Sequence, residues 1–331
     1  HSIGAFLFFD NFDLERNIYS VLLLFSCALG ALSFILICRH LNPADFNAGI
    51  KLTFVLMALL SLASFSGFSP LSDSQKAVLF YTEKSHYALD LLPLLFFIVT
   101  SCANHRKFTI LLVSLLGSII FKSLTLLLGI IFISFIFLGI KNLFKYIIYL
   151  LLFIFIITFL HESYSEYFFS RLDFQSNNLS LLCYLEGLDR SFINLKETYG
   201  YGLGFQQFGI HGSVSSIRSE IINISPSLAD INLLDGTTVA FKLIGEFGII
   251  GLILLCCYIS NTLSIYKWLK NITIHSASKN DPRDVFFACI FIMYFISFFV
   301  RGTGYFASSS FLFLASLFWV YGRSNKYIDL R

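Results

Sequence analysis

The chain has 331 residues, of which 56% are hydrophobic and 13% are charged. Soluble domains carry about 25% charged residues, so this composition, with a mean hydropathy of +0.77, excludes a water-soluble enzyme. The net charge of +3 at pH 7 is too small to favour nucleic acid as a partner. We therefore expect an all-α polytopic membrane protein that binds no nucleic acid.

Nine apolar stretches are long enough, or nearly so, to cross a bilayer as helices, because one crossing takes about 20 residues. The predicted transmembrane helices cover residues 18–38, 52–69, 87–103, 108–121, 124–140, 146–160, 238–260, 285–300 and 306–322. The run 108–140 is too long for one crossing and contains Lys122, so we expect a helical hairpin that turns at residues 121–125. Residues 3–9 are interpreted as the end of a truncated first helix.

One long polar segment divides the chain into three parts. We expect N-terminal transmembrane helices in residues 1–160, a large, partly helical loop in residues 161–237, and C-terminal transmembrane helices in residues 238–331. Of the seven cysteines only Cys183 lies in this loop, so the loop cannot contain an internal disulfide. A loop of this length in a membrane protein favours a function at the membrane surface.

The positive charges indicate the orientation of the predicted helices. Thirteen lysines and arginines fall in one set of short gaps between spans, and five fall in the opposite set. Short cytoplasmic loops are enriched in Lys and Arg, so the first set is predicted to be cytoplasmic. The large loop then lies on the other side, which in a bacterium makes it a periplasmic loop of a multi-pass protein in the inner (cytoplasmic) membrane.

Four arginines fall on the predicted periplasmic side: Arg171, Arg190 and Arg218 in the large loop, and Arg301 between the last two spans. A guanidinium group offers planar paired donors that fit phosphate oxygens, and it stays charged at any working pH. Each arginine alone is equally compatible with a solvated surface position. Four on one face favour an anionic ligand.

Lys242 and Glu246 open the span 238–260 at a spacing of four residues. Ionisable residues in or beside a span are costly unless they are paired or functional. The two side chains can pair with each other on one helical face. Alternatively, Lys242 holds a phosphate oxygen while Glu246 orients an arginine, and the sequence leaves both interpretations open.

Gly200, Gly202 and Gly204 form a Gly-x-Gly-x-Gly run in the large loop. Such runs cradle phosphates in some proteins, but this one lacks the preceding strand and following helix of a dinucleotide site. A flexible turn is the alternative interpretation.

Glu83 and His86 precede the third span at a spacing of three residues, which would place both on one face of a short helix. Either side chain can accept a proton from a hydroxyl if its pKa lies near neutrality. A hydrogen-bonded interfacial histidine is an equally good interpretation of His86. No HExxH or CxxC spacing occurs, so neither a metal nor another cofactor is expected.

These segments, in this order, resemble the bacterial O-antigen polymerases (Wzy type) of the O-antigen polymerase and ligase superfamily. The resemblance rests on Glu83-Lys-Ser-His86-Tyr-Ala, Gly200-Tyr-Gly-Leu-Gly-Phe205, Asn232-Leu-Leu-Asp235-Gly-Thr with Lys242-Leu-Ile-Gly-Glu246-Phe-Gly, and Arg301-Gly-Thr-Gly-Tyr305-Phe. It spans residues 80 to 306. Family members often have Pro after the Glu of the first motif, where this chain has Lys84.

The resemblance implies a metal-independent glycosyltransferase that joins undecaprenyl-diphosphate-linked repeat units into long chains at the periplasmic face and releases undecaprenyl diphosphate. The implied partners are the lipid-linked glycan donor and acceptor, membrane lipids and a chain-length regulator. The alternative functions are an O-antigen ligase or related lipid-linked glycan transferase and, less favoured because the hydropathy shows no internal repeat, a polysaccharide transporter or flippase.

The resemblance also suggests roles for individual residues. The diphosphate-binding residues would be Arg190, Arg218, Arg301, Lys242 and Arg171. The catalytic residues would be His86 or Glu83 as the base, with Glu246 orienting an arginine. The substrate-binding residues would be Gly200, Gly202, Gly204, Asp235 and Tyr305.

Overall fold

The computed structural model describes residues 5, 12–63, 78, 80–138, 148, 151–152, 155, 159, 162–172, 178–275 and 280–323. Within these ranges the chain is helical, with two isolated bridges and no strand. The predicted helix end at 3–9, apart from Ala5, and most of the predicted span 146–160 lie outside the described residues.

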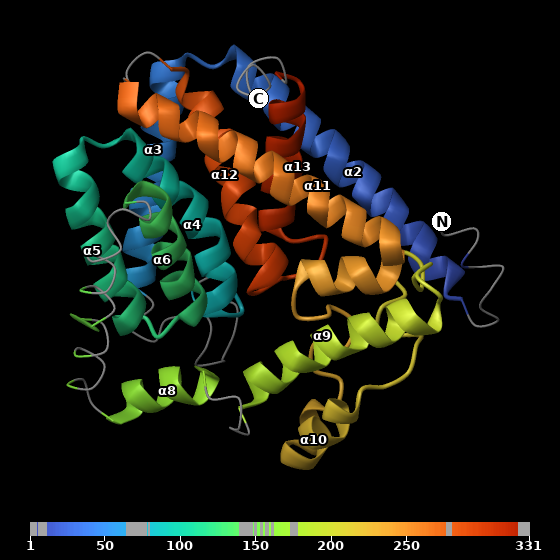
Figure 1. Ribbon diagram of the computed structural model, residues 1–331. Helices are drawn as coiled ribbons and strands as arrows, with labels where there is room; N and C mark the ends of the chain where they lie inside the picture. Colours follow the sequence, from blue (N-terminus) through green and yellow to red (C-terminus); the bar gives the residue numbers. More distant parts are fainter. Residues whose placement is uncertain are drawn as a thin grey trace. The chain divides into compact units, whose positions relative to one another are not determined.

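Figure 1 shows the helices in chain order. They are α2 (Leu14–His40), α3 (Pro43–Ala63), α4 (Lys84–Ser101), α5 (Asn104–Ile120), α6 (Leu124–Leu138), α8 (Glu162–Leu172), α9 (Leu179–Glu197), α10 (Ser216–Ile224), the short 3-10 helix η3 (Pro226–Leu228), α11 (Val239–His275), α12 (Pro282–Phe299) and α13 (Ser308–Tyr321). The predicted large loop is therefore partly helical, since α8, α9 and α10 lie in it.

Four of the described helices are long and apolar enough to cross a membrane. They are Leu14–His40, Pro43–Leu62, Val239–Ile272 and Pro282–Phe299. Two shorter apolar helices cover Leu124–Phe137 and Ser308–Tyr321. The predicted fold class is thus confirmed as an all-helical chain with membrane-spanning candidates, while the count of nine spans stays a prediction.

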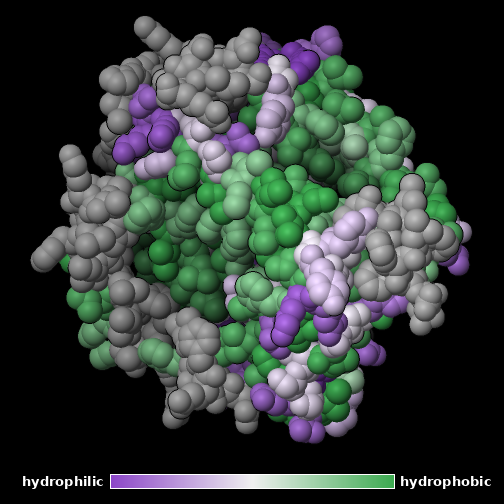
Figure 2. All heavy atoms as spheres, turned by 45° about the vertical axis from the view of Figure 1, so that its right-hand side comes forward, coloured by the Kyte–Doolittle hydropathy of each residue, from purple (hydrophilic) through white to green (hydrophobic). Residues whose placement is uncertain are grey.

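Large apolar side chains are exposed along the candidate spans. Leu22 and Phe25 on α2 are 57% and 61% exposed, and Leu62 on α3 is 62% exposed. Figure 2 shows hydrophobic side chains over much of one face of the molecule. Water-soluble monomers rarely expose continuous apolar surface of this kind, so these faces suit contact with lipid.

The predicted hairpin in the run 108–140 is confirmed at the level of the helices. Helix α5 ends at Ile120, and α6 begins at Leu124. Lys122 adopts a left-handed backbone with φ of 50°, and the Ser123 hydroxyl accepts a hydrogen bond from the N–H of Leu126 at 3.3 Å. A left-handed residue ends the first helix, and a serine cap starts the second.

The chain forms two compact units. Unit 1 comprises residues 1–31, 170–262 and 295–311, and unit 2 comprises residues 32–169, 263–294 and 312–331. The three-part division predicted above follows hydropathy along the chain, whereas these units follow spatial contacts. Each of the two units is described by itself.

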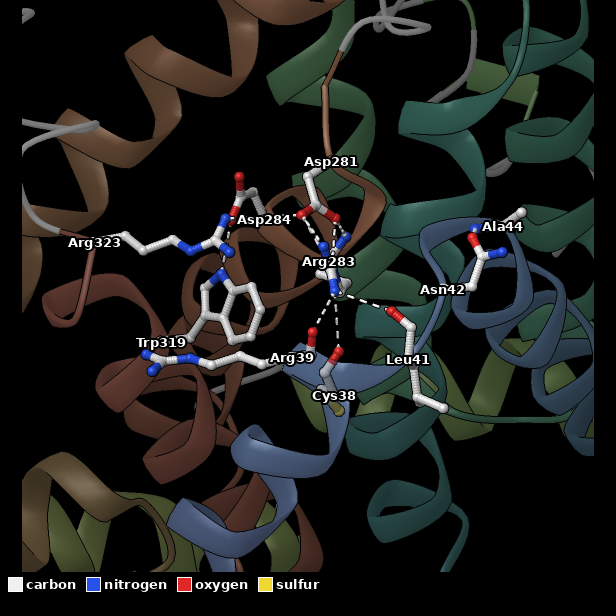
Figure 3. Close-up of polar contacts among 10 residues, drawn as sticks. All are labelled: Cys38, Arg39, Leu41, Asn42, Ala44, Asp281, Arg283, Asp284, Trp319 and Arg323. Carbon is white, nitrogen blue, oxygen red and sulfur yellow. Dashed lines mark hydrogen bonds and ion pairs between the residues drawn. The ribbon is translucent and has the colours of Figure 1, made fainter.

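In unit 2, Arg283 makes hydrogen bonds with the C-terminal end of α2 (Figure 3). Its Nη1 donates to the carbonyl oxygens of Cys38, Arg39 and Leu41 at 3.3, 2.9 and 3.0 Å. Its Nη2 lies 2.6 Å from Oδ2 of Asp281. Burial alone would raise the pKa of Asp281, but hydrogen bonds and charge from Arg283 lower it. The last carbonyls of a helix lack partners inside the helix, so this arginine caps α2.

A second buried contact in unit 2 joins α12 to α13. Asp284 is fully buried and accepts hydrogen bonds from Nε1 of Trp319 at 2.9 Å and from Nη1 of Arg323 at 2.5 Å (Figure 3). The guanidinium carbons of Arg323 and Arg39 lie 4.5 and 5.8 Å from the Trp319 ring centroid. Both arginines are therefore within cation–π distance of this ring.

Helix α11 is broken at Gly248, whose φ of 59° and ψ of −130° are not helical. An unbroken helix of 37 residues would be about 55 Å long, which exceeds the hydrocarbon thickness of about 30 Å. The break separates Val239–Phe247, which carries Lys242 and Glu246, from the apolar helix that follows. The predicted span 238–260 is therefore not one straight helix.

Substitution of Gly248 by alanine is expected to destabilise the protein strongly. A Cβ atom there would overlap the carbonyl oxygen of Gly200, and the backbone conformation disfavours side chains. We expect a loss of about 2–4 kcal/mol, measured by thermal unfolding of the purified protein in detergent. The matched control is Gly117→Ala in α5, where a Cβ meets nothing within 4 Å, and it should leave stability unchanged or slightly raised. Equal unfolding temperatures for the two variants would show that the break at Gly248 is not required.

Candidate functional site

In unit 1, residues 200–208 form a loop that is held on α11 by backbone hydrogen bonds. The Gly200 carbonyl accepts from the N–H of Ile249 at 2.8 Å, and the Gly204 N–H donates to the Glu246 carbonyl at 2.9 Å. Gly200, Gly202 and Gly204 have φ values of 84°, 88° and 100°. A Cβ on Gly202 would lie 2.5 Å from the Glu246 carbonyl oxygen. Glycine is thus required for both the conformation and the close approach.

The N–H groups of these three glycines are all bonded inside the chain. Besides the Gly204 bond to α11, the Gly200 N–H donates to the Leu195 carbonyl at 2.7 Å, and the Gly202 N–H donates to Oγ1 of Thr198 at 2.8 Å. A phosphate cradle needs free backbone donors that point at the ligand. In this structure the glycines fix the position of the loop instead.

Lys242 and Glu246 form the predicted pair on one face of α11 and also hold two loops. The Lys242 Nζ lies 4.0 Å from Oε1 of Glu246, and it donates to Oε1 of Gln206 at 3.2 Å and to the Leu234 carbonyl at 2.9 Å. The Glu246 Oε1 accepts from the N–H of Phe208 at 3.3 Å. Both residues are almost fully buried, so their contacts position residues 206–208 and 234.

The segment 301–305 lies against the same region of unit 1. The Gly302 N–H donates to the Thr237 carbonyl at 2.8 Å. The Tyr305 ring stacks on Phe205 at a centroid distance of 5.6 Å, and the Lys242 Nζ lies 5.0 Å from the Tyr305 ring centroid. A Cβ on Gly304 would lie 3.3 Å from Oδ1 of Asp235. Three segments that the sequence analysis selected separately are therefore close together.

Two arginines in this unit share one carboxylate, and we call Glu186, Arg190 and Arg218 the arginine cluster. The Arg218 Nη2 lies 2.9 Å from Oε2 of Glu186, and the Arg190 Nη1 lies 3.7 Å from Oε1 of Glu186. The three residues are 1% to 3% exposed. One carboxylate and two guanidinium groups leave one net positive charge in a buried place.

Arg218 is largely occupied by protein groups. Besides its ion pair with Glu186, its Nη1 donates to the carbonyls of Ala229 and Ile231, each at 3.0 Å. These bonds hold the segment that follows α10 against the rest of unit 1. Arg218 therefore contributes charge to the cluster and fixes the local backbone.

Arg190 keeps more of its hydrogen-bonding capacity. Its Nε and Nη1 are buried and make no hydrogen bond with any described residue, although Nη1 is in the ion pair with Glu186. Its guanidinium carbon lies 5.5 Å from the Phe208 ring centroid. One turn later on α9, the buried side-chain amide of Asn194 also makes no hydrogen bond in the part of the chain that the structure describes. Burial, opposed by the charge of Glu186, lowers the pKa of Arg190. Buried donors without a hydrogen bond are costly, so Arg190 and Asn194 are the best candidates to contact an anionic ligand.

Arg301 belongs to the segment that the hydrogen bond between Gly302 and Thr237 holds in unit 1, and its charge acts on the thiol of Cys183 in α9. Burial, the largest effect, raises the pKa of Cys183, whereas a hydrogen bond with Asn232 and the charges of Arg218 and Arg301 lower it. Arg301 and Arg218 thus both act on a residue that precedes Glu186 by one helical turn. Two of the four predicted arginines, Arg190 and Arg218, therefore meet at the buried face of α9, and Arg301 belongs to the same unit.

The remaining predicted residues lie elsewhere. Arg171 is half-buried in the last turn of α8 and is not part of the contacts above. In unit 2, Glu83 has an extended backbone and precedes α4, so it does not share a helical face with His86. The Glu83 Oε2 accepts from Oγ of Ser85 at 2.9 Å, and Nδ1 of His86 lies 3.3 Å from Oγ1 of Thr82. The predicted roles of Glu83 and His86 stay predictions.

The sequence analysis missed Glu186 and Asn194. With Arg190 they recur every four residues along α9, and this spacing places all three on one helical face. This four-residue spacing in the sequence was the pattern that could have indicated a shared polar face on α9. Within the described ranges, no group of three or more His, Cys, Asp and Glu side chains is arranged to hold a metal ion.

No protein-family model, no curated protein and no solved structure matches this chain. The functional argument therefore depends on the residues and their geometry. The feature that any function has to explain is a buried, net positive site in a chain with several membrane-spanning candidates.

Proposed function

We propose that the chain is an O-antigen polymerase of the Wzy type, which joins undecaprenyl-diphosphate-linked repeat units at the periplasmic face of the bacterial inner membrane. The observation that carries this proposal is the arginine cluster, where two buried guanidinium groups share one carboxylate and two nitrogens of Arg190 make no hydrogen bond among the described residues. A buried charge of this kind is best compensated by an anion. A diphosphate joined to a membrane lipid supplies such an anion, and its lipid part can lie against the apolar helices of the chain.

In the proposed reaction, an acceptor hydroxyl attacks the anomeric carbon of the donor glycan. The bond between this carbon and the diphosphate oxygen breaks, and undecaprenyl diphosphate leaves with the bonding electrons. Arg190 stabilises the negative charge that develops on the leaving group, with Arg218 and Arg301 adding positive potential. The resemblance names His86 or Glu83, both in unit 2, for the role of the base that takes the acceptor proton.

The other predicted site residues have positioning roles in this proposal. Lys242 and Glu246 hold the glycine loop and the segment before α11, which places Phe208 against Arg190. A site of this kind stabilises charge most effectively when its donors are fixed in advance. Asp235 and Tyr305 border the same region and are proposed to contact the sugars.

The proposal is tested by deleting the gene in its host and separating the surface glycans by electrophoresis. A polymerase defect leaves a single repeat unit on the lipid A-core and removes the ladder of long chains. Restoration of the ladder by the plasmid-borne gene is the required control. Loss of all surface glycan, including the single repeat, would instead indicate a ligase, and accumulation of lipid-linked repeats on the cytoplasmic side would indicate a flippase.

A further inference from the structure

Helix α9 has an unusual distribution of buried and exposed side chains. Its buried face carries polar residues, among them Glu186, Arg190 and Asn194. Its opposite face carries apolar residues spaced by four, three, four and three positions, which we call the outer stripe: Leu181, Leu185, Leu188, Phe192 and Leu195. This spacing follows the helical period, so the five side chains form one continuous stripe.

The outer stripe is not packed into the interior of unit 1. Phe192 is 55% exposed, and the four leucines are partly exposed. A helix on the surface of a water-soluble protein turns its apolar stripe to the core and its charged residues to solvent. On α9 the charged residues Glu186 and Arg190 are buried beside Leu182 and Cys183, while the outer stripe is partly exposed. This distribution favours apolar surroundings for the outer stripe.

The outer stripe leads directly to the apolar surface of a candidate membrane span. Beyond Leu195 the chain reaches Gly200, whose carbonyl accepts a hydrogen bond from the N–H of Ile249. A Cβ on Gly200 would lie 2.7 Å from Cδ1 of Ile249. Ile249 and Ile253 are 54% and 56% exposed on the part of α11 that is suited to cross a membrane. The exposed apolar surface of this part of α11 therefore begins beside the segment that follows α9.

We propose that α9 is an in-plane interfacial helix, with its outer stripe inserted at the boundary between lipid headgroups and acyl chains. Helices with one apolar face and one polar face adopt this position by burying the apolar side about 5–10 Å below the headgroups. Here the polar face is covered by unit 1 instead of water. The occupant of the outer stripe is the bilayer itself.

This position would hold the arginine cluster at the level of lipid headgroups. An α-helix with its side chains is about 10–12 Å across, so residues on opposite faces of α9 are separated by about that distance. A diphosphate attached to a membrane lipid would then reach Arg190 without leaving the bilayer surface. This consequence for the substrate rests on the proposed function, whereas the position of α9 does not.

The test is the depth of a tryptophan placed on the outer stripe. The full chain with Phe192→Trp is reconstituted in phosphatidylcholine vesicles whose acyl chains are brominated, and its emission is compared with that of the parent protein, which contains two tryptophans. We expect brominated lipid to quench the added emission, because the residue would lie at the boundary between headgroups and acyl chains. The control is Glu220→Trp, an exposed position on α10, which acrylamide in the water phase should quench and brominated lipid should not.

Two results would overturn the inference. Quenching of the Phe192→Trp emission by acrylamide alone would mean that the outer stripe faces water. Protection from both quenchers would mean that protein covers it, as in contact with a second copy or another membrane protein. Leu185→Trp provides a second reporter on the same stripe if Phe192→Trp does not fold. The quenching experiment contains no substrate, so it tests the position of α9 independently of the proposed function. If the chain shows lipid quenching but no polymerase activity, the proposed function is refuted and the position of α9 still holds.

Discussion

Replacement of Arg190 by alanine is expected to remove the ladder of long surface glycans and leave single repeat units. The variant deletes two buried donors from the site where the leaving group gains charge. Loss of one preorganised donor of this kind lowers catalytic rates by about 100- to 1,000-fold. The measurement is electrophoresis of surface glycans from a gene-deletion strain that carries the variant, with the protein level checked by immunoblotting.

Two further variants make this experiment specific. Arg190→Lys keeps the charge but loses the planar fork, so it should restore only short ladders. Lys196→Ala removes an exposed positive residue from the same helix and should give a full ladder. A full ladder from Arg190→Ala at normal protein level would contradict the assignment of Arg190 to the diphosphate.

The second large effect is expected from Glu186→Gln, which removes the only carboxylate in the arginine cluster. The glutamine has the same shape but cannot compensate two buried guanidinium groups that are 2% and 3% exposed. Removal of one partner from a buried ion pair costs about 3–5 kcal/mol. We expect a clear fall in the unfolding temperature of the detergent-solubilised protein.

The matched control for this variant is Glu220→Gln on α10. Glu220 is exposed, and surface substitutions of this kind change stability by about 0.5 kcal/mol or less. If both variants unfold at the temperature of the parent protein, Glu186 does not hold the two arginines in place. The charge argument for the site would then lose its basis.

The sequence predicted the parts of the fold that depend on local patterns. The hairpin in the run 108–140 followed from its length and from Lys122, and the structure confirms a break after Ile120. Helical spacing left two interpretations of Lys242 and Glu246 open, and the structure shows the pairing that one of them described. The hairpin could be predicted because the information lies within a few residues along the chain.

Features set by tertiary contacts were beyond reach. The glycine loop suggested a phosphate cradle, but the partners of its N–H groups, such as the Thr198 hydroxyl, become known only when the loop meets its neighbours. The break at Gly248 likewise depends on the close approach of Gly200. The buried role of Glu186 contradicts the expectation that charged residues face water, so only the helical spacing on α9 hinted at it.

The most direct test of the proposed function is polymerisation by the purified protein. The full chain is reconstituted in vesicles with undecaprenyl-diphosphate-linked repeat units from its host, and the lipid-linked products are sized by mass spectrometry. We predict products that grow by whole repeat units with release of undecaprenyl diphosphate, and no growth with the Arg190→Ala variant. Unchanged single repeat units after incubation with the folded parent protein would contradict the proposed function.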